Sequence, residues 1–256
     1  MHQFPKPPFR VRLVSWIPFV ASAALAALGI QLVLRAPLLA LAFGAMALLV
    51  FTPQLLARRR VKRLLLSGDV DSVLGAWRSA LDNVPHRETM APLITATALA
   101  ANGMIDRARA ELARAAKGEA WEAALEHRLF VETLLDAFEG HRQEAVAKAE
   151  LLSTLPLPTV GPFVRDRVTT LRAAAGALAR AFARNPHKGD LAKLENAARR
   201  NPLVHWAMRY AAAVSYVDRG EATRARRMIS EAPVWPAESA FHDFHAELLG
   251  RVDAGS

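Results

Sequence analysis

Two histidines near the C-terminus, His242 and His245, are the side chains best placed for metal chemistry, with Asp243 and Glu247 beside them. On a helix, residues three apart can share one face, and imidazole and carboxylate groups are ligands that zinc accepts. Zinc needs three protein ligands or more, and this spacing does not identify a third one. We therefore predict no metal site and expect solvated histidines on the last helix.

The sequence has no motif typical of catalysis. It lacks H-E-x-x-H, G-x-S-x-G, a P-loop and a glycine-rich dinucleotide fingerprint. It also has no cysteine, which excludes disulfides, thiolate metal ligands and a cysteine nucleophile. We expect no enzyme, no cofactor and no small-molecule substrate.

Basic residues raise the net charge to +9, but they are unevenly distributed. Beyond residue 63 the chain carries 24 basic and 24 acidic residues, so it lacks the net positive charge typical of nucleic-acid binding. Four arginines still gather around one turn, where they could meet an acidic partner or lipid headgroups. Because Glu221 and Glu231 are close in sequence, a solvated helix face is the favoured interpretation of this cluster, which comprises Arg219, Arg224, Arg226 and Arg227.

The first 56 residues contain no acidic side chain and form two apolar stretches. Residues 13–34 and 38–56 are uncharged and long enough to cross a bilayer, so they predict a transmembrane hairpin. A cleaved signal peptide ending near Ala23 is the alternative, but the apolar run continues well past that point. Basic residues flank the hairpin, and the positive-inside rule predicts that both termini are cytoplasmic. With the Ala- and Arg-rich composition, this favours an integral protein of a bacterial inner membrane that contacts the lipid bilayer.

Four glycines divide the region beyond residue 60 into similar units: Gly68, Gly103, Gly140 and Gly220. Small or apolar residues follow each glycine at fixed distances. Five positions later stand Val73, Ala108, Ala145 and Ala225, nine later Trp77, Leu112, Ala149 and Ile229, and twelve later Ala80, Ala115, Leu152 and Ala232. This pattern predicts pairs of antiparallel helices, because glycine permits the turn and small residues let the helices approach. The last gap is 80 residues long, so we expect one degenerate unit with helices over 163–183 and 191–200.

The pattern resembles the tetratricopeptide repeat (TPR), whose period is about 34 residues and whose motif includes Gly, Ala and a closing Pro. The unit with Tyr216, Gly220, Ala225, Ile229 and Ala232 carries most of the marks. The order of elements, a double span followed by TPR-like helices, is similar to that of HemY-type membrane-anchored TPR proteins. Trp77 is expected in the core at the large position of its repeat, whereas the exposure of Trp235, in a loop between two prolines, is left open.

The fold class expected from these patterns is all-α: an N-terminal segment (1–12), a transmembrane hairpin (13–57), a TPR-like α-solenoid (58–236) and a capping helix with a tail (237–256). The leading hypothesis is a membrane-anchored scaffold that binds a protein partner in the solenoid groove. The alternative is an accessory subunit of a membrane enzyme or secretion complex, bound through its hairpin. In the last clear repeat we expect the groove to present an apolar strip made of Ala207, Tyr210, Val214 and Val217.

Overall fold

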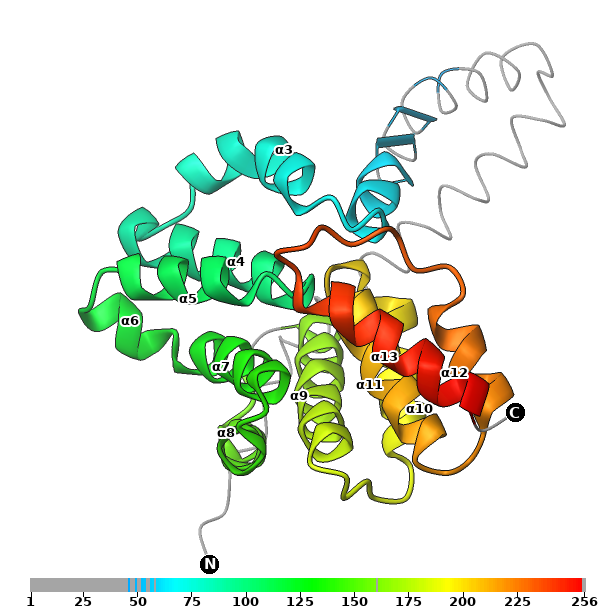
Figure 1. Cartoon of the computed structure of the whole chain (residues 1–256). Coiled ribbons are helices and arrows are strands. Elements are labelled where there is room, and N and C mark those ends of the chain that lie inside the picture. The colour runs from blue at the N-terminus through cyan, green and yellow to red at the C-terminus, as the bar shows by residue number, and fades with distance from the viewer. Residues whose placement is uncertain are drawn as a thin grey trace, which may run out of the picture. The chain divides into compact units, whose positions relative to one another are not determined.

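The computed structural model describes residues 61–159 and 161–254, and before them Met46, Leu49, Thr52, Pro53, Leu56, Ala57, Arg59 and Arg60. Within these residues the regular structure is helical and no strand occurs, so the predicted all-α class is confirmed. A helical stretch over residues 61–66 comes first. It is followed by α3 (Val70–Asp82), α4 (Arg87–Ala101), α5 (Ile105–Arg114), α6 (Glu119–Ala123), α7 (Leu125–Glu139), α8 (Arg142–Thr154), α9 (Pro162–Phe182), α10 (Asp190–Arg200), the 3-10 helix η1 (Pro202–Val204), α11 (His205–Val217), α12 (Ala222–Ile229) and α13 (Ala240–Ala254) (Figure 1).

Glycines in the left-handed region make the turns between paired helices. Gly103 joins α4 to α5 with φ 76°, Gly140 joins α7 to α8 with φ 85°, and Gly220 joins α11 to α12 with φ 73°. At each turn the N–H of the residue after the glycine donates to the carbonyl of the residue four positions before the glycine. This is a Schellman-type helix end. The three bonds run from Met104 to Leu99 (3.0 Å), from His141 to Asp136 (2.8 Å) and from Glu221 to Tyr216 (2.9 Å). Three of the four periodic glycines, Gly103, Gly140 and Gly220, thus mark helix hairpins.

The degenerate unit is a fourth such hairpin, formed by α9 and α10. The predicted helices, 163–183 and 191–200, agree with the observed ones to within one residue at each end. Gly189, with φ 89°, lies in the turn between them, and Leu194, five residues later, is fully buried. The repeat alignment missed this glycine because it comes 49 residues after Gly140, far from the spacing of the other units.

The helices pack in a solenoid-like array with two rows. In the first row α4 contacts α7, α7 contacts α9, and α9 contacts α11. In the second row α5, α8, α10 and α12 each pack on the first helix of their own pair. The first row curves so far that α4 also contacts α11 and η1. Elements from the two ends of the first row are therefore in contact.

The predicted internal positions are mostly buried. The four residues five positions after the glycines, Val73, Ala108, Ala145 and Ala225, are at most 3% exposed. Three positions are exceptions: Trp77 on α3 and Ala232 after α12 are only half-buried, and Ala80 on α3 is exposed. Among the described elements α3 packs mainly on α4, so Trp77 is half-buried and not in the core position expected.

The C-terminal helix α13 packs across several units. Its Phe241 is fully buried, with its ring centroid 4.6 Å from that of Tyr210 in α11 and 5.0 Å from that of Phe138 in α7. Just before α13, the Ser239 hydroxyl donates to the carbonyl of Asn102 at the α4–α5 turn, over 2.8 Å. The last helix thus joins the first described hairpins to the last.

The prediction of an integral membrane protein needs correction. Among the described residues, none of the helices combines the length and apolar character needed to cross a bilayer, so no membrane span is assigned there. The predicted spans, 13–34 and 38–56, and the N-terminal segment lie outside the described residues, apart from Met46, Leu49, Thr52, Pro53 and Leu56.

Candidate functional site

A cavity of about 700 Å³ lies among the helices of the first row. Its lining comes chiefly from α4, α6, α7 and α9 and from η1. Ligand sites in proteins have volumes of about 300–1,000 Å³ and predominantly apolar walls with a few polar groups. This cavity fits that description, with the apolar side chains of Met90, Ala124, Phe130, Val168, Leu171 and Leu203 in its wall.

The space exists because small residues occupy one wall. The short helix α6 packs against both α4 and α7, and it contributes Ala120 and Ala123 to the lining. Ala124, at the junction of α6 and α7, adds another methyl group. Since alanine extends no further than Cβ, this part of the wall takes up little of the space inside the cavity.

One polar pair in the lining has its hydrogen atoms fixed by geometry. The Thr97 hydroxyl donates to the carbonyl of Leu93 over 2.8 Å, and its oxygen lies 2.7 Å from Nε2 of His127. A hydroxyl has one hydrogen, so His127 Nε2 must be the donor in the second contact. Burial lowers the pKa of His127, which keeps the ring neutral at pH 7. Nδ1 then carries a lone pair that can accept a hydrogen bond from a ligand.

The arginine in the cavity lining is already bound. Arg172 in α9 donates from Nε and Nη2 to the carboxylate of Glu126, over 3.1 and 2.8 Å. It also donates to the carbonyls of Leu155 and Pro156, over 2.6 and 3.1 Å. The guanidinium is therefore committed to holding the loop after α8 against α7 and α9, and it does not present a free charge to the cavity.

An exposed apolar strip continues the cavity along α9. Val168 and Leu171 line the cavity, and Val164 lies one turn before Val168 on the same face. Val164 is 50% exposed and the adjacent Phe163 is 86% exposed, which is unusual for large apolar side chains. The amino-terminal half of α9 therefore extends the apolar wall beyond the enclosed space.

The strip predicted to face a groove is in the core instead. Ala207 and Tyr210 are fully buried, Val214 is 7% exposed, and Val217 is half-buried. The reason is that α13 and the loop before it cover this side of α11, with Phe241 and Trp235 packed on Tyr210. These four residues are not an accessible surface. The open apolar surface is instead provided by the cavity and α9.

The two C-terminal histidines have separate partners. His242 is exposed and its Nδ1 lies 2.8 Å from the carboxylate of Asp243. His245 Nδ1 lies 2.9 Å from the hydroxyl oxygen of Tyr210, and burial lowers the pKa of this histidine. The two imidazoles therefore do not form one ligand set.

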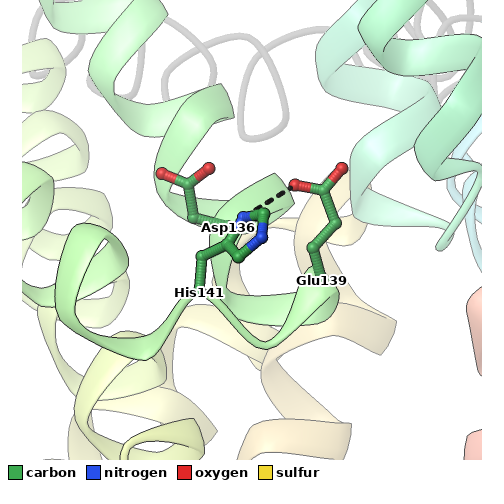
Figure 2. Close-up of side chains that lie close together, drawn as sticks. All are labelled: Asp136, Glu139 and His141. Carbon is green, nitrogen blue, oxygen red and sulfur yellow. Dashed lines mark ion pairs between the residues drawn. The ribbon is translucent and has the colours of Figure 1, made fainter.

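Asp136, Glu139 and His141 form the one group among the described residues whose ligand atoms are close enough to hold a metal ion. Figure 2 shows Glu139 and His141 facing each other across the turn after α7, with 3.6 Å between Nδ1 and the carboxylate. Two cations already lie at this cluster. Arg109 bonds both carboxylates, and Lys148 Nζ lies 2.6 Å from Asp136 Oδ2. The hydrogen bond to Glu139, and that to Asp136, raise the pKa of Arg109, so an ion-pair network explains the cluster.

The arginine cluster at the α11–α12 turn is partly neutralised. Arg224 pairs with Glu221 over 2.6 Å, and Arg226 pairs with Asp253 of α13. Arg227 and Arg219 form no ion pair with any residue that the structure describes. Two of the four arginines are thus in ion pairs, and the other two have none among the described residues.

The sequence analysis missed the cavity and its polar residues. His127, Thr97 and Arg172 belong to no motif, and they come together only because three helices of the first row meet there. The signal that could have drawn attention to α9 was Pro162-Phe163-Val164, an apolar start to a helix after a loop. Comparison of the chain with protein-family models, with curated proteins and with solved structures found no match.

Proposed function

We propose that this chain is a TPR-like helical scaffold that binds a segment of a partner protein and catalyses no reaction. One observation carries the proposal: an apolar cavity of about 700 Å³ that opens among the first-row helices and continues onto the exposed face of α9. The glycine turns and the two rows of helices support the TPR-like assignment. Helical solenoids bind other proteins through extended surfaces of this kind.

A chain segment fits this site better than a compact small molecule does. The enclosed part could hold one or two large apolar side chains, and the exposed Val164 and Phe163 lie outside it. A small molecule would leave these two residues in water, whereas a partner segment that enters the cavity could cover them with its neighbouring residues. Burying such surface is worth roughly 25 cal/mol per Å² before the costs of association.

The polar groups of the site give the segment an orientation. Arg172 is already satisfied by Glu126 and two carbonyls, so it offers the ligand little. His127 Nδ1 is an acceptor in a mostly apolar wall. A bound segment that places a hydroxyl or amide donor beside it would gain a hydrogen bond that an all-apolar segment cannot make.

The test uses peptides selected from a displayed random library against the whole chain, then synthesised and titrated. Ala123 is exposed and lies in the cavity lining, so Ala123→Trp should fill the opening without disturbing the core. We expect at least a tenfold loss of peptide affinity, about 1.4 kcal/mol. Ala110→Trp, an equal change on the exposed face of α5, is the matched control and should leave the affinity unchanged.

Two results would overturn the proposal. One is a set of selected peptides that bind Ala123→Trp as well as they bind the original chain. The other is a library that yields no peptide, together with an apolar fluorescent dye that binds the original chain but not the Ala123→Trp variant. The second result would assign the cavity to a small apolar molecule.

A further inference from the structure

A second cleft, with a volume of about 410 Å³, lies over α11 and between α10 and α12. It shares no lining residue with the cavity described above. Its floor is apolar and consists of Ala198, Met208, Ala212 and Met228. Its walls carry four arginines, Arg199, Arg209, Arg224 and Arg227, against one carboxylate, Glu195. The cleft therefore combines an apolar base with positively charged sides.

Two of the four arginines have structural roles. Arg209 has a largely buried side chain, 13% exposed, and donates to the backbone carbonyls of Met228 and Arg227. Arg224 pairs with Glu221 over 2.6 Å. These guanidiniums shape the cleft and hold α12 against α11, and their charges are partly compensated by Glu231 and Glu221.

The other two arginines are uncompensated. Arg199 at the end of α10 and Arg227 near the end of α12 are exposed, and neither forms an ion pair with the residues described in this structure. The carboxylate of the lining, Glu195, forms no ion pair with either of them in the described structure, and its Oε1 accepts the hydroxyl hydrogen of Tyr216 over 2.6 Å. Two cations from opposite walls thus remain available to a ligand.

The imidazole in the lining adds no acid–base partner. His205 Nδ1 lies 2.9 Å from the carbonyl of Ala198 and must donate to it, since a carbonyl oxygen only accepts. Its Nε2 faces the guanidinium of Arg209 at 3.5 Å. Both ring nitrogens are therefore engaged within the cleft wall.

We propose that this cleft is a second binding site, which takes an acidic peptide segment whose apolar side chain lies on the methionine floor and whose flanking carboxylates pair with Arg199 and Arg227. Guanidinium binds carboxylate through two parallel hydrogen bonds, so each pair would fix direction as well as charge. The apolar floor distinguishes such a segment from a simple anion, which would use the arginines alone. Arginine and methionine are both enriched at protein–protein interfaces.

Calorimetric titration of the whole chain with a short capped peptide, in which leucine is flanked on both sides by glutamate, tests this site. The double change Arg199→Glu and Arg227→Glu should weaken binding at least about tenfold. Neither side chain has an ion-pair partner among the described residues, so the fold should survive the change. Arg78→Glu, a charge reversal at an exposed position of α3, should leave the affinity unchanged. Replacing the peptide's leucine with serine should also weaken binding.

Three outcomes would overturn the proposal. The first is no binding of the peptide. The second is an equal loss of peptide affinity with Arg78→Glu, which would indicate an effect of net charge only. The third is full competition by inorganic phosphate, together with an affinity that does not change when the leucine is replaced. The last would reduce the site to a simple anion site. Ala123→Trp serves as a further control, since it changes the cavity and should not affect this cleft. Failure at one site is therefore distinguishable from failure at the other.

Discussion

Trp235 donates its indole hydrogen to the hydroxyl oxygen of Tyr210, with 2.7 Å between Nε1 and Oη. Tyr210 is fully buried in α11, and Trp235 is 4% exposed in the loop before α13. The tyrosine hydroxyl also lies 2.9 Å from His245 Nδ1, to which it can donate its own hydrogen. One hydroxyl thus satisfies the buried Trp235 and the half-buried His245, and it fixes α13 and its loop on the helical array.

Tyr210→Phe should destabilise the chain because it leaves the buried indole N–H of Trp235 without an acceptor. An unsatisfied buried donor costs about 1–3 kcal/mol, measured as a loss in the free energy of unfolding in urea. Tyr216→Phe is the matched control. Its hydroxyl bonds Glu195, which is only half-buried and can be hydrated after the change. Equal losses in the two variants would contradict the role assigned to Trp235.

The helix hairpins could be predicted because their signal is local. A glycine that must adopt positive φ at the end of a helix, with small residues at fixed distances after it, specifies a turn and a close contact within one unit. The α9–α10 boundaries followed from the same reasoning, and the glycine at 189 escaped only because it departs from the period.

The predicted strip on α11 was wrong because its environment is not local. The repeat pattern indicates that Tyr216 packs within its own hairpin. It does not indicate what covers Tyr210, which lies on another face of α11. That cover comes from Trp235 and Phe241, on a loop and helix whose docking position no motif specifies. The cavity was missed for the same reason, since it depends on the curvature of the whole first row.

Gly103→Ala should be more harmful than Gly140→Ala, although both glycines have similar φ. The left-handed conformation costs a non-glycine residue about 1–2 kcal/mol at either position. At Gly140 a new Cβ meets no atom within 4 Å, whereas at Gly103 it would lie 2.7 Å from Ser239 Oγ and 3.0 Å from Phe241 Cγ. Overpacking adds about 1–3 kcal/mol, so we expect a total loss of about 2–5 kcal/mol at Gly103. Thermal unfolding of both variants measures the difference, and equal losses would place α13 elsewhere.

Asp190 should make stability depend on acidity. Burial by itself would raise the pKa of Asp190, but bonds from Arg180, the backbone N–H of His187 and Lys193 outweigh it and hold the pKa well below its ordinary range. Because the folded pKa is lower than the unfolded value of about 3.9, the stabilisation is complete above that pH and lost as the pH falls below it.

Asp190→Asn should therefore cost about 3 kcal/mol at neutral pH, the lower end for a broken buried pair, because Lys193 still reaches solvent. The gap between this variant and the original chain should narrow as the pH falls below about 4. Asp71→Asn, at an exposed ion pair with Arg107, should cost less than about 1 kcal/mol at any pH. Urea unfolding at several pH values measures both. A gap that stays constant at low pH would mean that the Asp190 carboxylate is not the titrating group.

His127 should add to the dependence of the chain's stability on pH. Burial lowers its pKa below the unfolded value of about 6.5, so the unfolded chain binds the proton first as the pH falls. The contribution of His127 to stability is then complete above about pH 6.5 and declines below it, by up to about 1.4 kcal/mol per unit of pKa difference.

His127→Leu removes this decline, so the loss of unfolding free energy between neutral pH and about pH 5 should become smaller than in the original chain. His205 and His245, whose pKa values burial also lowers, contribute to the slope that remains. NMR titration of the imidazole signals provides a direct check, because a His127 pKa at or above about 6.5 would contradict the dominant effect of burial on this ring.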